Sequence, residues 1–423
     1  MRVSKADYWR GRIFLVTWLA YASFYLTRKS FSVAKIGMAE DPAILLTKGQ
    51  MSSIDAAFLV SYAAGQFFWG MLGDRKGARK LVLLGMMGSI LTAAAMGFSS
   101  TAVLFGVFFC LQGLFQSAGW APLTKNISDW FSRKERGVVM GWWSTNYVVG
   151  GIVAAPLAGL CADLFSNWRY GFFGPAAGLG VITALFFIFQ KDRPADVGLP
   201  DVEPALNDPE SPAAGRPAGA SWEEIAAVLR NRVVVLLGAI YFFLKPTRYA
   251  ILFWGPLYVH ETLGTGMAQS GLVSIAFDVG GPLGVLAGGY ISDKLFGSRR
   301  MPISAISLFV LSPLLLFFGR LTAAPSALLI AGLFFAIGFL ANLPESLIGG
   351  TAAVDFGGRK GASTASGFIN GCGSAGAIFG GALPGVIAAA WGWGALFAAL
   401  GLSVLVAGLL LLPKWNALPA DPR

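Results

Sequence analysis

The chain has 423 residues, of which 55% are apolar and only 13% are charged, and its mean hydropathy is +0.65. This number of charged residues is too small to cover the surface of a soluble domain. The composition therefore indicates a membrane protein. The net charge of +10 is then explained by membrane topology and contact with anionic lipid rather than by nucleic-acid binding.

Apolar windows of about 20 residues, the length that crosses a bilayer, recur along the whole chain. They predict an all-α membrane protein with twelve transmembrane helices. The first is not a cleaved signal peptide, because Tyr25 and Arg28 interrupt its long apolar stretch. The expected helices span residues 11–38, 51–72, 80–98, 101–126, 137–163, 169–190, 233–259, 268–292, 302–319, 325–351, 361–388 and 392–413.

A polar segment rich in Pro, Ala and Gly divides six expected helices from the other six. Its composition is typical of a flexible linker, and a short amphipathic helix is expected near residues 221–229. The predicted organisation is an N-terminal six-helix bundle at 1–190, a cytoplasmic linker at 191–232 and a C-terminal six-helix bundle at 233–423.

Lysine and arginine residues concentrate in the segments that would lie on one side of the membrane together with both chain ends. This asymmetry predicts that both termini are cytoplasmic. The start of the chain does not resemble an organelle-targeting leader, so we expect a plasma membrane, specifically a bacterial inner membrane. We also expect a monomer.

Catalytic and metal-binding chemistry has little support in this sequence. The three cysteines fall inside expected helices, and the single histidine, His260, lies at the end of one. No cluster of His, Cys and carboxylates has metal-ligand spacing. We therefore expect no catalytic residues, no metal and no cofactor, and we do not expect an enzyme.

An internal repeat relates the two halves of the chain. A loop motif after the second expected helix recurs after the eighth, offset by 219 residues with one extra residue in the second copy. The same offset, within one residue, relates Tyr21 to Tyr241 and Arg28 to Arg248, which indicates a duplicated six-helix unit. The first copy contains Gly70, Asp74, Arg75, Gly77, Arg79 and Lys80, and the second contains Gly289, Asp293, Lys294, Gly297, Arg299 and Arg300.

Three cations, Arg28, Lys245 and Arg248, lie within expected membrane spans. Each costs about 2.5–3.5 kcal/mol there, so such residues are kept mainly where they face a cavity and bind something. The spacing i, i+4, i+7 places Tyr21 and Tyr25 on the face of Arg28, and the same spacing joins Tyr241, Lys245 and Arg248. Two arginines that face one cavity near the midplane suit a tetrahedral dianion such as phosphate.

Two acids, Asp278 and Glu345, also lie within expected spans. Because a buried ammonium group usually finds a carboxylate, we expect Lys245 to pair with Asp278. Glu345 would then be protonated or paired elsewhere, which leaves two arginines for one dianion. An empty site would be repulsive and a loaded site neutral, and this difference favours exchange over net transport.

The loop motif from Gly70 to Lys80 resembles the signature of the major facilitator superfamily. The resemblance implies that Asp74 and Arg75 act in gating. Longer runs are similar to the organophosphate:phosphate antiporter family; they are Tyr25-Leu-Thr-Arg-Lys-Ser-Phe31, Gly119-Trp-Ala-Pro122 through Gly137, Arg193-Pro through Pro200, Arg248-Tyr through Tyr258, and Ser292-Asp-Lys through Arg300.

This resemblance implies exchange of inorganic phosphate for an organic phosphate, such as a sugar phosphate, glycerol 3-phosphate or a phosphoglycerate. Tyr147 stands where glycerol-phosphate transporters carry a histidine and Gln66 where they carry a lysine, which weakens a glycerol-phosphate assignment. The runs Phe277-Asp-Val-Gly-Gly281 and Asn370-Gly-Cys-Gly-Ser-Ala-Gly376 are more similar to the sugar-phosphate members, which favours a sugar phosphate or a related three-carbon acid. Two alternatives stay open: a membrane sensor of external sugar phosphate, and a proton-coupled organic-anion symporter that uses Asp278 or Glu345. The expected substrate-binding residues are Arg28, Arg248, Lys245, Tyr21, Tyr25, Tyr62, Trp120, Tyr147 and Asp278.

Overall fold

The computed structural model describes residues 4–44, 46–131, 135, 139–140, 142–200, 202, 231–297 and 299–416. The helix expected near residues 221–229 lies outside this range. The chain divides into two compact units. Unit 1 comprises Met1–Leu46, Ala57–Arg216 and Gly266–Gly271, and unit 2 comprises Thr47–Ala56, Pro217–Thr265 and Leu272–Arg423.

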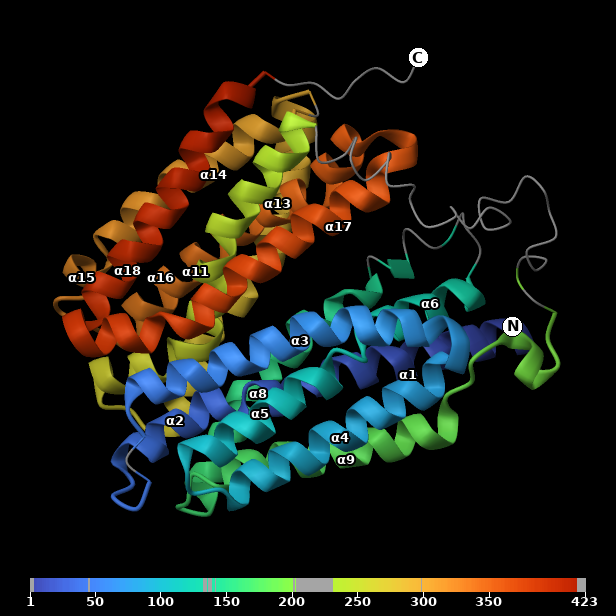
Figure 1. Cartoon of the computed structure of the whole chain (residues 1–423), viewed down its shortest axis with the longest axis horizontal. Coiled ribbons are helices and arrows are strands. Elements are labelled where there is room, and N and C mark those ends of the chain that lie inside the picture. The colour runs from blue at the N-terminus through green and yellow to red at the C-terminus, as the bar shows by residue number, and fades with distance from the viewer. Residues whose placement is uncertain are drawn as a thin grey trace. The chain divides into compact units, whose positions relative to one another are not determined.

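Helices account for most of the described residues in the first half of the chain (Figure 1). They are α1 (Lys5–Arg28), α2 (Ser30–Glu40), α3 (Lys48–Lys76), α4 (Ala78–Phe98), α5 (Ala102–Gln116), α6 (Trp120–Trp130), α8 (Thr145–Leu164) and α9 (Tyr170–Phe189). The first residues of α3, as far as Ala56, belong to unit 2, and the rest of that helix belongs to unit 1.

The second half is also mostly helical, with long helices and two short ones of 8 and 4 residues. They are α11 (Arg232–Leu263), α12 (Met267–Ser274), α13 (Ala276–Leu295), α14 (Arg300–Leu316), α15 (Phe318–Leu321), α16 (Ala327–Ser346), α17 (Ala353–Ala382) and α18 (Pro384–Leu411), with a π-helical segment, Leu347–Ala352, between α16 and α17.

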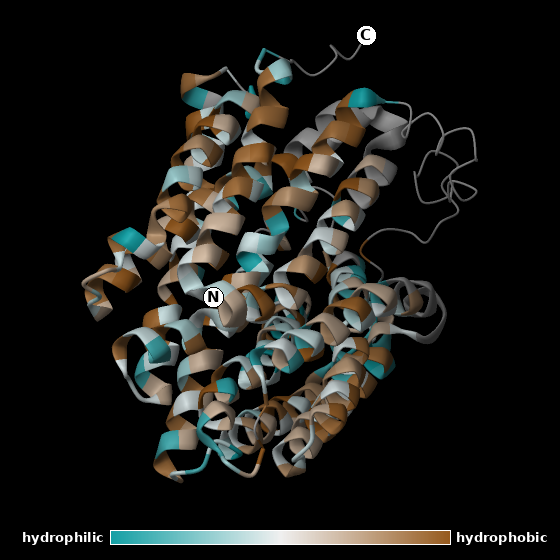
Figure 2. Cartoon of the chain, turned by 60° about the vertical axis from the view of Figure 1, so that its left-hand side comes forward, coloured by the Kyte–Doolittle hydropathy of each residue, from teal (hydrophilic) through white to brown (hydrophobic). Residues whose placement is uncertain are grey.

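Among the described residues, eight helices are long and apolar enough to cross a membrane. Apolar residues occupy most turns of these helices (Figure 2). Large apolar side chains such as Phe98 and Leu328 are 78% and 85% exposed, which water would penalise and lipid does not. The outer surface of the helices therefore suits a lipid environment.

Several expected helices are interrupted in the structure. The first expected helix is two helices, because Lys29 separates α1 from α2, and residues 117–119 separate α5 from α6. Ile275 separates α12 from α13. By contrast, the break within α18 at Gly392, where φ is 81° and ψ is 170° and the backbone conformation favours glycine, falls where the last expected helix begins.

Unit 1 is held together by α1, α8 and α9, which pack on one another, and by α4, which packs on α5 and α9. Its core contains Phe24, Trp130, Trp143 and Phe186, all at most 1% exposed. Packing around α1 matters for function because α1 carries the first of the expected binding residues.

Unit 2 is organised around two close helix pairs, α11 with α17 and α13 with α16. Glycines allow the second pair to approach: a Cβ atom on Gly338 of α16 would collide with the carbonyl oxygen of Phe277 on α13, and one on Gly280 of α13 with that of Phe335 on α16. This packing places α16 next to α13 on one side and next to α11 on another.

Candidate functional site

Arg28 is the last residue of α1 and is only 6% exposed. Aromatic rings surround its guanidinium group: the Cζ atom lies 4.4 Å from the ring centre of Tyr25, 4.8 Å from that of Tyr62 and 5.9 Å from that of Phe58. Such contacts stabilise a cation away from water. The structure thus brings together three of the expected site residues, Arg28, Tyr25 and Tyr62.

Gln116 orients the Arg28 side chain from the end of α5. The Nε of Arg28 donates a hydrogen bond to Oε1 of Gln116 at 2.8 Å, and Nε2 of Gln116 donates to Oγ1 of Thr27 at 3.0 Å. One turn earlier, Nε2 of Gln112 donates to the carbonyl oxygen of Thr27 at 2.9 Å. The sequence reasoning missed both glutamines, although their i, i+4 spacing in an apolar helix was a usable signal.

Tyr21, one turn before Tyr25, is part of an aromatic cluster. Its ring centre lies 6.1 Å from that of Tyr25, 5.1 Å from that of Trp120 and 5.8 Å from that of Trp143. Tyr147 of α8 packs against the same core. Tyr21 and Tyr25 therefore belong to the buried core around α1, and Trp120 and Tyr147 pack against it.

In unit 2, Lys245 and Arg248 of α11 converge on Glu345 of α16. The Oε1 atom of Glu345 accepts from Nζ of Lys245 at 2.6 Å and from Nη1 of Arg248 at 2.7 Å. Nζ of Lys245 also lies 4.8 Å from the ring centre of Tyr241. The cluster carries two positive charges and one negative charge.

The expected pair between Lys245 and Asp278 is wrong, because Glu345 is the carboxylate that contacts Lys245. The reason lies in the packing of the helices. Helix α11 packs on α16, α17 and α18, whereas α13, which carries Asp278 in its first turn, packs mainly on α16. Glu345 is also paired with Arg248, so the expectation of two arginines without a nearby acid is wrong as well.

Glycines make room for this cluster. A Cβ atom on Gly349 would lie 2.6 Å from the hydroxyl oxygen of Tyr241, and one on Gly373 would collide with the Tyr241 ring and lie 3.2 Å from Cγ of Lys245. Larger residues at these two positions would push the polar face of α11 aside.

The loop motif after α3 is described only in part. Gly77 has φ 81° and lies next to the Asp192 side chain in space. Asp192 accepts a hydrogen bond from the backbone N–H of Arg79 at 2.8 Å, and this bond caps the start of α4. The guanidinium of Arg79 donates to the carbonyl oxygen of Phe187 at 2.6 Å. Asp192 was not anticipated. Lys294 is exposed, Gly70 lies within α3, and the side chains of Asp74, Arg75 and Asp293 lie outside the described residues.

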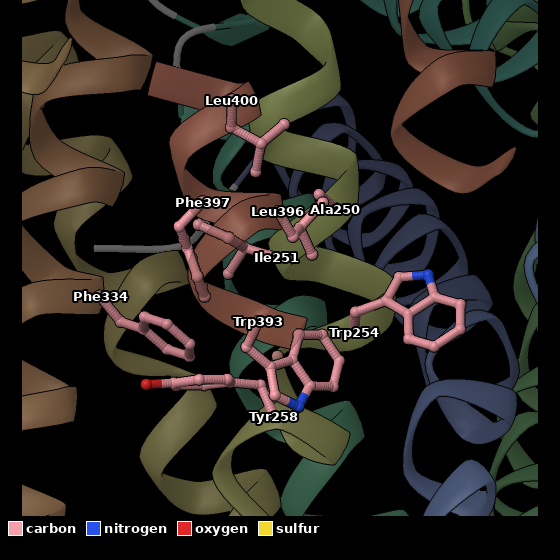
Figure 3. Close-up of a pocket in the computed structure, with 10 residues that line it drawn as sticks. Ala250, Ile251, Trp254, Tyr258, Phe334, Trp393, Leu396, Phe397 and Leu400 are labelled. Carbon is pink, nitrogen blue, oxygen red and sulfur yellow. The ribbon is translucent and has the colours of Figure 1, made fainter. Parts of the chain in front are cut away.

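Other kinds of site have less support. No group of three or more His, Cys, Asp or Glu residues that could hold a metal ion occurs within the described residues. A small pocket in unit 2 is lined by Trp254, Tyr258, Phe334, Trp393 and Phe397 with smaller apolar residues (Figure 3). It contains no charged group and its volume is about 10 Å³, so it is too small for an organic phosphate.

The two cationic clusters offer what an anion requires in a membrane-embedded protein. Arginine presents a planar fork of donors that matches the oxygens of phosphate or carboxylate. Membrane-embedded cations held by aromatic rings, an amide and a carboxylate are typical of substrate sites in transporters. The helices and these clusters together define a multi-pass membrane transporter.

Comparison with known proteins identifies the family. Residues 17–353 match the Major Facilitator Superfamily, so the chain belongs to that superfamily. A bacterial homologue of the human lysosomal transporter Spinster, solved in an inward-facing and unoccupied conformation, has the same fold, with a TM-score of 0.75 at 15% identity over 97% of this chain and 96% of that chain.

Curated relatives match over nearly the whole chain. The probable hexose phosphate transport protein of Chlamydia pneumoniae is 33% identical, over 99% of this chain and 94% of its own length. The membrane sensor protein UhpC of Escherichia coli strain K12 is 33% identical, over 97% of this chain and 93% of its own length. These bacterial relatives agree with the expected resemblance and with a multi-pass protein of the inner membrane.

Proposed function

We propose that this protein is a secondary active transporter that exchanges an organic phosphate for inorganic phosphate by alternating access. The observation that carries the proposal is an arginine on the first helix of each repeat, buried in the case of Arg28 and partly buried in that of Arg248, and held by an oriented acceptor: Arg28 by Gln116, and Arg248 by Glu345. The names of the relatives supply the substrate class. The protein is then a carrier and not an enzyme.

The proposal includes the topology expected from the sequence. Twelve helices cross the membrane as two six-helix halves, and both termini lie in the cytoplasm. The concentration of basic residues on one side supports this orientation. A working unit of one chain suffices, because each half supplies its own cationic cluster.

The charges of the two clusters explain why the carrier would exchange substrates rather than carry out net one-way transport. Lys245, Arg248 and Glu345 together carry one net positive charge, and Arg28 adds a second. A phosphate dianion carries two negative charges, which would offset these two positive charges. Movement of an uncompensated charge through the low-dielectric interior is costly, so the loaded carrier reorients more readily than the empty one.

A sugar phosphate is the favoured organic substrate. The half-buried ring of Trp120, which contacts Tyr21, can stack on a sugar ring while Arg28 binds its phosphate. Tyr147 and Gln66 replace the histidine and lysine associated with glycerol phosphate, and the hexose phosphate relative agrees in substrate class.

Proteoliposome exchange tests the proposal. Vesicles are loaded with inorganic phosphate, glucose 6-phosphate, glycerol 3-phosphate or buffer, and uptake of labelled phosphate is measured. We expect uptake only with a phosphate compound inside, and loss of uptake in Arg28→Lys and Arg248→Lys, because a lysine cannot reproduce the two parallel hydrogen bonds of a guanidinium group.

The matched control is Arg320→Lys, which makes the same chemical change at an exposed residue on α15. It should leave exchange unchanged. Uptake that needs no internal phosphate and follows an imposed pH gradient would contradict the antiporter and indicate proton-coupled symport.

A sensor is the second candidate function, because UhpC is as similar to this chain as the transport protein is. A sensor would bind a sugar phosphate through the same residues without rapid exchange. Binding measured by calorimetry, together with absent exchange in folded protein, would favour this candidate.

A further inference from the structure

Glu345 contacts two cations of the C-terminal cluster through one oxygen atom. Its Oε1 accepts from Lys245 at 2.6 Å and from Arg248 at 2.7 Å, and the side chains of Glu345, Lys245 and Arg248 are 9%, 14% and 25% exposed. A carboxylate oxygen offers these donors the same kind of acceptor as a phosphate oxygen, because both are anionic. Glu345 therefore occupies donors that a phosphate would use.

The equivalent arginine of the first repeat has a different kind of acceptor. Nε of Arg28 donates to Gln116, whose amide is neutral. A neutral amide orients the guanidinium group without reducing its charge, whereas a carboxylate does both. Gln116 is thus a neutral acceptor for Arg28, whereas Glu345 is an anionic acceptor for Arg248.

We infer that Glu345 is an internal substitute for the substrate phosphate. It pairs with Lys245 and Arg248 while the site is empty, and it releases Arg248 when phosphate binds. This inference rests on the proposed exchange function. Replacement of one anionic acceptor by another gives Arg248 an anionic partner in both the empty and the loaded site, although only the loaded site has its net charge offset.

The same competition sets affinity and speed. Because phosphate must displace a bound carboxylate, its net binding free energy is reduced by the energy of the pair that it breaks. The carboxylate then helps to expel phosphate after reorientation. Glu345 would therefore weaken binding in order to permit rapid release.

Calorimetry and exchange assays on the full chain test this role. In Glu345→Gln, the Kd of inorganic phosphate should fall about tenfold or more, and exchange should slow because release is slower. The reciprocal variant Gln116→Glu should raise the Kd, because it places a competing carboxylate on Arg28. A purely structural role for Glu345 predicts weaker binding in Glu345→Gln.

A second comparison avoids the instability that loss of Glu345 beside two cations would cause. Lys245→Met removes one cation and leaves Arg248 paired with Glu345, and the double variant Lys245→Met with Glu345→Gln replaces that carboxylate with a neutral amide. Addition of the second substitution should tighten phosphate binding relative to Lys245→Met alone. Weaker binding overturns the inference, whereas wild-type protein that neither binds nor exchanges phosphate overturns the proposed function instead.

Discussion

Nε of Arg28 donates a 2.8 Å hydrogen bond to Oε1 of Gln116, and both side chains are buried. Gln116 is in turn fixed by its own hydrogen bonds to Thr27 and to the carbonyl oxygen of Phe24, both on the helix that carries Arg28. The glutamine therefore couples the direction of the guanidinium group to the backbone of α1.

We expect Gln116→Leu to raise the KM of phosphate exchange about tenfold, because a hydrogen bond to a charged group contributes about 1.5–3 kcal/mol and its loss lets Arg28 turn away. Exchange kinetics in proteoliposomes measure the change. The control is Gln190→Leu, another fully buried glutamine in unit 1, whose amide binds Asn126 and a backbone carbonyl. It should reduce stability without a change in KM.

The opposite pattern would contradict the positioning role of Gln116. If Gln116→Leu lowers the melting temperature but exchanges phosphate with the wild-type KM, then the hydrogen bond serves folding alone. Gln116→Asn separates the two effects further, since it keeps the amide but shortens the reach to Arg28.

The sequence predicts which residues share a helix face, but not which helix faces which. The 3.6-residue period placed Tyr25 near Arg28, and Lys245 and Arg248 on one side of α11, because spacing within one helix is fixed by its geometry. The choice between Asp278 and Glu345 depended on how α11 packs against α16, and this contact arises from side-chain shape far along the chain.

Two breaks in the expected helices could not be predicted from the hydropathy of the sequence either. Neither Lys29 nor Ile275 belongs to the residue types that usually end helices, so hydropathy joined α1 to α2 and α12 to α13. Gly392 is different, because its positive φ is a glycine property, and the start of the last expected helix falls at that residue.

A polar network joins the first turn of α3 to α11 and α18 within unit 2. Nζ of Lys48 lies 2.7 Å from Oε2 of Glu261, and the same oxygen accepts from Nε1 of Trp393 at 2.8 Å. The Lys48 and Glu261 side chains are about a quarter to a third exposed, so we expect a coupling energy of no more than about 1 kcal/mol.

A double-mutant cycle measures this coupling. The variants Lys48→Met, Glu261→Gln and the combination are compared by thermal unfolding in one detergent, at low and at high salt. The coupling should shrink at high salt because ions screen exposed pairs. A salt-independent coupling of several kcal/mol would contradict the expectation.

Asp41 lies in the loop after α2, outside the spanning helices. Its Oδ2 accepts from Nε1 of Trp168 at 3.0 Å and its Oδ1 from the backbone N–H of Ala43 at 2.9 Å. These hydrogen bonds, the one from Trp168 first, lower the pKa of the Asp41 carboxyl group below its ordinary value. A lowered folded-state pKa stabilises the fold above the unfolded-state pKa, and this stability is lost as the pH falls through the folded-state pKa.

We therefore expect Asp41→Ala to melt at a lower temperature than wild type at pH 7, and the difference to shrink as the pH falls below about 4. Melting curves between pH 7 and pH 3 measure it. Trp168→Phe removes the main hydrogen-bond donor to Asp41. In that background, the change in melting temperature caused by Asp41→Ala should depend less on pH. A difference that grows toward low pH would contradict the assignment.

Close contact between α13 and α16 depends on Gly338, where a Cβ atom would collide with the carbonyl oxygen of Phe277. Because backbone cannot yield as a side chain does, Gly338→Ala should force the helices apart and cost about 1–3 kcal/mol. Gly332→Ala on the same helix is the control, since nothing lies within 4 Å of a Cβ atom there. Alanine favours helix over glycine, so Gly332→Ala should leave stability unchanged or raise it.

Equal melting temperatures for the two variants would show that the contact tolerates a methyl group. A loss confined to Gly338→Ala, accompanied by weaker phosphate binding, would indicate that this packing also positions Glu345, the second-last residue of α16.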